Sequence, residues 1–374
     1  MSEVSLTENL KAEEESYTDD ALYNITSFET EIMLSQIVTM YENGDIEKPD
    51  LQRNYVWTKA EASRFIDSIL LGLPVPSIFL AKDKDNRLQI VDGLQRITTI
   101  CDYFRGVFSL DNSVFKLSNR ENIYFRWRNK AYSELSEAEK RAIRTYSIHA
   151  IVFEQKKPSD NSGMYQIFER INTGGRVLKP QEIRNSVYHG SFNNLLKELN
   201  KISVWRSILG SENPDTRMSD IELVLRFFAF IDLKNRDEYQ QKQINLVKYL
   251  NTYMSDHVDV GLEESEKFKS LFFDIITFIN SHLGSHAFRA GKIQKDGSVR
   301  WAKKVNPVIF DAVCTATYLS SKMIQLPDKL LDISYEQLVT NEEFIMATTQ
   351  RTTNIKNIKK RTEMAAKILY DVDI

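Results

Sequence analysis

The spacing of apolar residues changes near residue 160, and this change constrains the fold more than any other feature of the chain. From about residue 26 to 155, short β-rich runs alternate with helical spacings, whereas beyond about 160 the spacings are almost wholly helical. We therefore expect an α+β protein, with a small mixed α/β domain at 26–158 and a mostly helical domain at 159–374. Residues 1–25 hold seven acidic side chains against one lysine, which predicts an acidic flexible tail.

Composition excludes several classes of protein. The net charge of −3 argues against a polycation that coats nucleic acid, so any contact with DNA must come from local patches. No apolar run approaches the ~20 residues that span a bilayer, and the start of the chain lacks a signal-peptide pattern. Cys101 and Cys314 have no partners at the spacing of metal ligands. We expect a cytoplasmic protein with no membrane contact and no resident metal site.

Helix-start signals and β-rich runs predict the elements of the first domain. Thr58 with Glu61, and Ser136 with Glu139, have the spacing of a capping box and predict helices over 58–72 and 136–145. The runs 75–80 and 88–91 predict a hairpin, and 148–153 predicts a further strand.

The segment Asp92-Gly93-Leu94-Gln95-Arg96 lies where a predicted strand meets a predicted helix. Gly93 permits a tight turn, and the free N–H groups of the following helix start favour an anion. Arg96 can add a bidentate cation, Asp92 can act as a base or hold a metal-bound water, and Gln95 can orient an attacking water. The spacing is typical of a phosphate cradle, although an Asp-Gly turn that caps a helix needs no ligand.

Two further polar segments are candidates for the same site. Gln52 and Arg53 precede Tyr55 and Trp57, whose rings can stack on a base or anchor the loop to the core. Arg170 and Asn172 lie where a helix is expected to end at a pair of glycines. Helix capping and solvated arginines are the alternative interpretation of this second segment.

A basic stretch in the helical half is the candidate contact to DNA. Its cations alternate with Phe288 and Trp301, and aromatic rings among cations can stack on bases. The predicted DNA-binding residues are Arg289, Lys292, Arg300, Lys303 and Lys304. The alternative is a charged face that contacts only solvent.

Together these segments resemble the N-terminal domain family of GmrSD-type restriction endonucleases. The resemblance is carried by Gln52-Arg53-Asn54-Tyr55-Val56-Trp57, by Asp92-Gly93-Leu94-Gln95-Arg96, and by Phe168-Glu169-Arg170-Ile171-Asn172 with Gly174, Leu178 and Glu182. It implies a ParB/sulfiredoxin-like fold that binds and hydrolyses a nucleoside triphosphate in systems that restrict modified or foreign DNA. Leu94 departs from the glutamine usual in the family, which puts hydrolysis in doubt more than binding.

The leading hypothesis is thus an NTP-binding and NTP-hydrolysing protein of a prokaryotic restriction or anti-phage system that acts on or senses DNA. Asp92, Gln95 and Arg96 would be catalytic, with Gln52, Arg53, Gly93, Arg170 and Asn172 binding the nucleotide, with or without Mg²⁺. One alternative is a ParB-like DNA-binding module that binds nucleotide without turnover, and another is a DNA nuclease. Because the HNH-type cluster of larger relatives is missing, a partner nuclease is a candidate partner. The sequence leaves self-association open.

Overall fold

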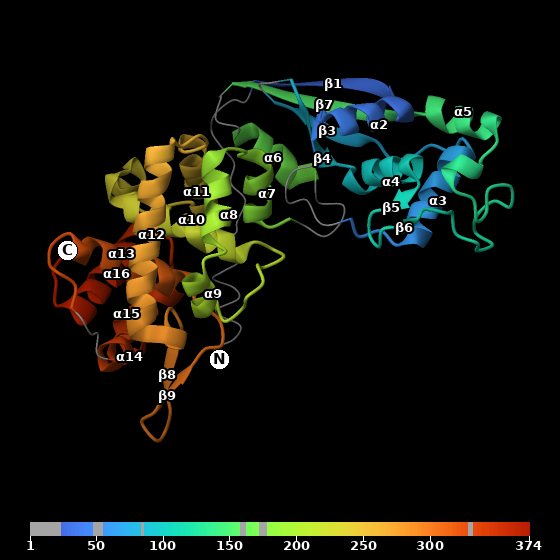
Figure 1. Cartoon of the computed structure of the whole chain (residues 1–374). Helices are drawn as coiled ribbons and strands as arrows, with labels where there is room; N and C mark the ends of the chain where they lie inside the picture. Colours follow the sequence, from blue (N-terminus) through green and yellow to red (C-terminus); the bar gives the residue numbers. More distant parts are fainter. Residues whose placement is uncertain (1–23, 48–54, 84–85, 158–161, 172–177, 328–331) are drawn as a thin grey trace. The chain divides into compact units, whose positions relative to one another are not determined.

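The structure is a computed structural model of the chain (Figure 1). It describes residues 24–47, 55–83, 86–157, 162–171, 178–327 and 332–374. These residues fall into two compact units, which we describe separately. The mixed unit comprises the described residues up to Leu178 together with Asn185–Val187, and the helical unit comprises Lys179–Arg184 and Tyr188–Ile374.

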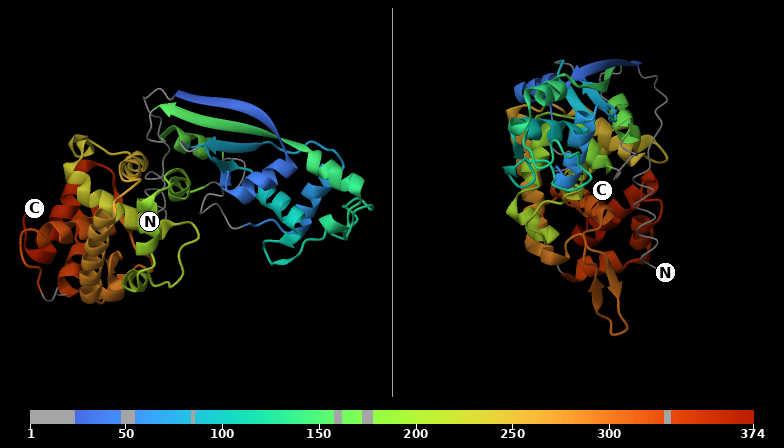
Figure 2. Two further views of the ribbon diagram at one scale, coloured as in Figure 1. Left: turned by 45° about the horizontal axis from the view of Figure 1, so that its top comes forward. Right: turned by 90° about the vertical axis from the view of Figure 1, so that its right-hand side faces the viewer.

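A five-stranded mixed sheet forms the centre of the first unit. Its strand order is β1-β7-β3-β4-β2. The bounds are β1 Asn24–Met33, β2 Ile46–Glu47, β3 Ile78–Lys82, β4 Leu88–Asp92 and β7 Ser147–Lys157. β7 pairs antiparallel with β1 and parallel with β3, while β4 pairs antiparallel with β3 and parallel with β2. Figure 2 shows the long β1–β7 pair at one edge of this sheet.

Period-two burial explains why β7 is a strand with one face toward the core. Ile148, Ala150 and Val152 are buried, while the residues between them are partly exposed. On β3, Ile78 and Leu80 face the same way, because Ile78 pairs with Ala150 and Leu80 with Val152. The predicted hairpin and the predicted strand are confirmed. β1 was not predicted.

Helices cover one face of the sheet (Figures 1 and 2). They are α2 Leu34–Asn43, α3 Lys59–Leu70, α4 Leu94–Arg105 and α5 Glu137–Thr145. The helix α6 Ser162–Ile171 follows later in the chain and approaches β4. Both predicted capping boxes are present. The side chain of Thr58 accepts from the backbone N–H of Glu61, and the carboxylate of Glu61 accepts from the backbone N–H of Thr58. Ser136 and Glu139 make the same pair of hydrogen bonds. The short strands β5 Val107–Phe108 and β6 Ser113–Val114 pair after α4.

The second unit is built almost wholly of helices, as predicted (Figure 1). After α7 Pro180–Val187 come α8 Ser191–Leu199, α9 Ser203–Leu209, α10 Ser219–Asp232, α11 Leu246–Asp256, α12 Leu262–Leu283, α13 Pro307–Ser321, α14 Asp332–Thr340, α15 Glu342–Thr349 and α16 Ile355–Tyr370. A hairpin of β8 Gly291–Ile293 and β9 Val299–Trp301 interrupts the series. The α+β fold class is confirmed, while the ParB/sulfiredoxin-like fold stays a prediction.

A buried ion pair links two central helices of the helical unit. Asp311 on α13 is 1% exposed and accepts from Nε and Nη2 of Arg226 on α10, at 3.1 and 2.6 Å. Arg361 on α16 brings a second guanidinium, with its Nη2 3.9 Å from the same carboxylate. Removal of one partner would leave buried charge without compensation.

We therefore expect Asp311→Ala to lower the free energy of unfolding by about 3–5 kcal/mol, the range for breaking a buried ion pair. Asp311→Asn keeps the shape and one acceptor, so its loss should be smaller. Asp274→Ala removes an exposed carboxylate on α12 and should change stability by less than about 0.5 kcal/mol. Denaturant unfolding of the three variants checks this, and equal losses for Asp311→Ala and Asp274→Ala would contradict it.

Candidate active site at the β4–α4 junction

Gly93 joins β4 to α4 in a backbone conformation that other residues rarely adopt. Its φ is +104°, in the left-handed region. A Cβ at this position would lie 2.6 Å from Cγ2 of Ile78, at the start of β3. The glycine therefore allows the first turn of α4 to lie against β3, and no side chain caps this helix start. The strand-to-helix junction predicted here is confirmed.

Arg96 makes hydrogen bonds to both strands at the junction, at the end of β4 and directly before β3. Its Nη2 donates to Oδ2 of Asp92 at 2.5 Å and to the carbonyl oxygen of Ser77 at 3.0 Å. Its Nε is buried and has no hydrogen-bond partner in the described part of the chain. The guanidinium is therefore fixed on one side, and one of its donors stays unsatisfied among the described residues.

Gln95 connects this junction to the segment that begins with Gln52. Its side-chain oxygen accepts from the backbone N–H groups of Val56 and Trp57, at 3.0 and 3.2 Å. One turn later on α4, Oγ1 of Thr99 lies 2.8 Å from the hydroxyl of Tyr55. The two segments, about forty residues apart in sequence, thus form one site. Gln52 and Arg53 themselves lie outside the described residues.

The aromatic side chains next to the site pack into the core. Tyr55 is buried edge-on against Phe108, and burial raises the pKa of its hydroxyl above the usual value. Trp57 packs edge-on against Phe65 of α3. These contacts agree with the interpretation of both rings as anchors of the loop.

Leu94 is a packing residue in this fold. It is 6% exposed and belongs to the hydrophobic core of the mixed unit. The position therefore supplies apolar contact at the first residue of α4.

A second polar chain at the same junction was not predicted. Oγ of Ser77, whose carbonyl receives Arg96, lies 3.0 Å from Nδ1 of His149 on β7. Nε2 of this histidine lies 3.5 Å from Oε2 of Glu29 on β1. A hydroxyl, an imidazole and a carboxylate in sequence can pass a proton. No sequence spacing could reveal the three, because only the β1-β7-β3 strand order brings them together.

The structure describes only the first part of the predicted segment that begins at Phe168. Arg170 is exposed at the end of α6, and α6 approaches β4, the strand that ends at Asp92. Asn172 lies outside the described residues. Among the residues that the structure does describe, no group of three or more His, Cys, Asp or Glu side chains could hold a metal ion.

The predicted DNA-binding residues of the helical unit divide into buried and exposed ones. Arg289 is 8% exposed and donates to the carbonyl oxygens of Ile208 and Ala287, so its inclusion in a DNA-facing surface was wrong. Lys292 and Arg300 are exposed and directly opposite each other on the β8–β9 hairpin. Lys303 and Lys304 are also exposed. No helix in the described ranges is long and apolar enough to cross a membrane.

Gly93→Ala should be more destabilising than an ordinary glycine substitution at positive φ. Gly106, at the other end of α4, has a φ of +76°, and a Cβ there would meet nothing within 4 Å, so Gly106→Ala is the matched control. We expect a loss of about 1–2 kcal/mol for the control, and about 1–3 kcal/mol more for Gly93→Ala because of the clash with Ile78. Thermal unfolding compares the two, and equal losses would contradict the close approach.

Comparison with known proteins agrees with this geometry. Residues 34–189 match the family model described as GmrSD restriction endonuclease, N-terminal domain. No curated protein and no solved structure matches the chain. The matched range contains α2 to α7 and the whole β4–α4 junction. Over residues 34–189 this chain is therefore similar to a GmrSD-type restriction endonuclease N-terminal domain.

Proposed function

We propose that the mixed unit binds a nucleoside triphosphate at the β4–α4 junction and hydrolyses it, and that the protein acts on or senses DNA as part of a restriction or anti-phage system. The observation that carries the nucleotide proposal is Arg96, a largely buried cation whose Nε lacks a partner among the described residues, beside an uncapped helix start. The matched family, named for restriction endonucleases, supports DNA as the target.

The junction offers three features that suit a phosphate. The first-turn N–H groups of α4 lie at the positive end of the helix dipole, and no side chain caps them. Gly93 brings no side chain to the turn that precedes these N–H groups. Arg96 adds charge and directed donors, with Arg53, Gln52, Arg170 and Asn172 as further candidate ligands from the neighbouring segments.

Hydrolysis would require a group that orients water and a group that accepts a proton. Gln95 is held by its oxygen, which leaves its amide nitrogen to donate toward a bound group. Asp92 is half-exposed and paired with Arg96, and is the candidate for Mg²⁺ that arrives with the phosphates or for the base. The Ser77–His149 pair is a second candidate for the proton acceptor.

The burial of Leu94 favours the alternative in which the site binds a nucleotide without hydrolysing it. With an apolar side chain packed at the first residue of α4, the site can bind a triphosphate through Gly93 and Arg96 without turning it over. Incubation of the full chain with each of the four triphosphates, with and without DNA, separates the functions. Phosphate release supports hydrolysis, binding without release supports the alternative, and nicked DNA would indicate a nuclease.

Arg96→Ala should weaken triphosphate binding by about 1.5–3 kcal/mol, the range for a charge-assisted hydrogen bond. Arg105→Ala is the matched control, because it removes an exposed arginine at the far end of the same helix, where it pairs with Glu42. Calorimetry should show near-wild-type affinity for the control. Unchanged affinity in folded Arg96→Ala protein would remove Arg96 from the site.

We propose the β8–β9 hairpin as a contact to the DNA backbone, so binding should weaken steeply as salt rises. Lys292→Glu/Arg300→Glu should weaken binding and flatten the salt dependence, because two phosphate contacts and their counterions are lost. Lys201→Glu/Lys242→Glu changes the charge of the helical unit equally at other exposed positions. Superimposable salt curves for the two double variants would show that the hairpin lysine and arginine contact only solvent.

A further inference from the structure

A cavity of about 720 Å³ lies wholly within the helical unit, apart from the site proposed above. Its lining comes from α7 and the preceding Lys179, from α9, α10 and α11, and from the segments 211–217 and 303–307. One wall is apolar and includes the buried side chains of Leu223, Leu246, Val247 and Leu250. This volume is in the range of small-molecule sites.

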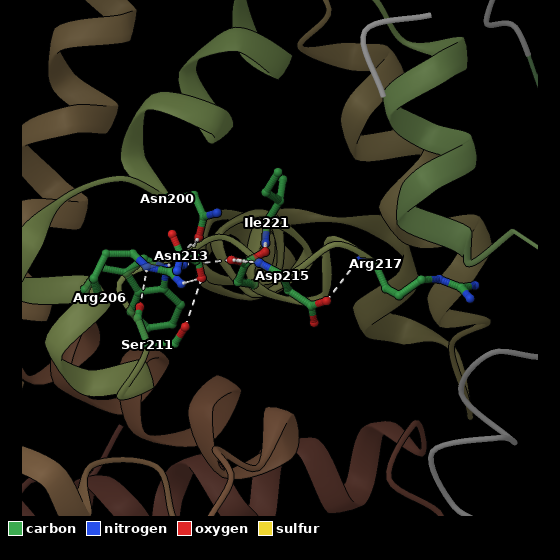
Figure 3. Close-up of polar contacts among 9 residues, drawn as sticks. Asn200, Arg206, Ser211, Asn213, Asp215, Arg217 and Ile221 are labelled. Atoms are coloured by element: carbon green, nitrogen blue, oxygen red, sulfur yellow. Dashed lines mark hydrogen bonds and ion pairs between the residues drawn. The ribbon is translucent and has the colours of Figure 1, made fainter. Parts of the chain in front are cut away.

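Hydrogen bonds of the protein itself hold the polar loop 211–215 that lines the cavity. Arg206 donates through Nε to the carbonyl oxygen of Ser211 at 2.8 Å and through Nη2 to that of Asn213 (Figure 3). Its Nη1 lies 2.7 Å from Oδ2 of Asp220, which also accepts from the N–H of Asp215 at 2.8 Å. The loop that borders the cavity is thus held by a buried ion pair.

A buried glutamine of this cavity keeps a donor without a partner. Gln181 and Arg184 are each 1% exposed, and Nη1 of the arginine donates to Oε1 of the glutamine at 3.0 Å. Nε2 of Gln181 has no partner among the described residues. Buried donors are almost always satisfied, so an unsatisfied one in the lining of a cavity indicates a missing acceptor.

The cations that line the cavity outnumber its carboxylates. Asp220 is matched by Arg206, and Glu222 lies 3.1 Å from Nη1 of Arg184. Lys303 and Lys304 also line the cavity, and they are exposed, with no ion pair to any residue that the structure describes. Two adjacent, exposed ammonium groups in the lining favour an anion with more than one negative charge.

We infer that this cavity binds a 5′-nucleotide, with the base against the apolar wall and the phosphate at Lys303 and Lys304. The unsatisfied carboxamide N–H of Gln181 would donate to a carbonyl oxygen or ring nitrogen of the base. The same chemistry can be supplied by a free nucleotide or by the 5′-phosphorylated end of a single DNA strand. This inference does not depend on the triphosphate site of the mixed unit.

The test uses the full chain with two probes, 5′-AMP and a 5′-phosphorylated single-stranded pentadeoxyadenylate, and adenosine as the uncharged comparison. Lys303→Gln/Lys304→Gln should weaken binding of the phosphorylated probes by about tenfold or more, because two charge-assisted contacts are lost. Adenosine should bind more weakly than 5′-AMP and equally to both proteins. Lys201→Gln/Lys242→Gln removes the same charge from exposed positions outside the cavity and outside the β8–β9 hairpin, and should bind as wild type.

Arg96→Ala protein serves as the second background, since loss of the triphosphate site should leave 5′-AMP binding at this cavity intact. Binding that depends on Lys303 and Lys304 supports the inference. Binding of 5′-AMP alone identifies a free nucleotide as the source, binding of the pentadeoxyadenylate alone identifies a DNA end, and binding of both shows that the cavity accepts either. Absence of binding of both probes to the wild-type chain, or equal affinity for the Lys303→Gln/Lys304→Gln variant, would overturn it. Loss of 5′-AMP binding in Arg96→Ala would likewise overturn it, by assigning that binding to the mixed unit.

Discussion

The contact of Arg96 with Asp92 and with the carbonyl of Ser77 is the interaction on which the candidate site depends. It joins the end of β4, the start of β3 and the first turn of α4 through one guanidinium. The geometry is possible because Gly93 adopts a positive φ and brings no side chain against Ile78. A largely buried arginine in this position serves the fold and the site at once, since one of its donors stays unsatisfied by the described residues.

From this contact the rest of the site follows along α4. Gln95, one residue before Arg96, accepts from the backbone N–H groups of Val56 and Trp57, and the hydroxyl of Thr99, one turn later, is hydrogen-bonded to that of Tyr55. The side of the helix therefore holds a second segment in place next to the helix start. On the sheet side, Ser77 continues the network to His149. The described motif residues thus position one another through these contacts.

Much of the fold could be predicted from the sequence, because local signals and packing agree there. Capping boxes at Thr58 and Ser136 are local, and they begin the predicted helices. β1 could not be predicted, because it is an edge strand with mostly exposed side chains and hence little hydrophobic alternation. The β8–β9 hairpin could not be predicted either, because its strands are short and largely exposed and so show little hydrophobic alternation.

For the site, the sequence indicated which segments are rich in polar groups but not how those groups are engaged. Burial separates Arg289 from the exposed Lys292 and Arg300, and no charge pattern carries that information. The partners of His149 come from strands distant in sequence. Leu94 shows the same limit, because only the packed structure reveals that it belongs to the core.

The most direct test of the central claim is the position at which a triphosphate changes the backbone amide signals of the full chain. Nuclear magnetic resonance with ¹⁵N-labelled protein can follow each amide during a titration with the triphosphate that binds. We expect the largest shifts at Leu94, Gln95 and Arg96, because a phosphate at an uncapped helix start contacts its first N–H groups. Largest shifts elsewhere, with these three amides unchanged, would contradict the account.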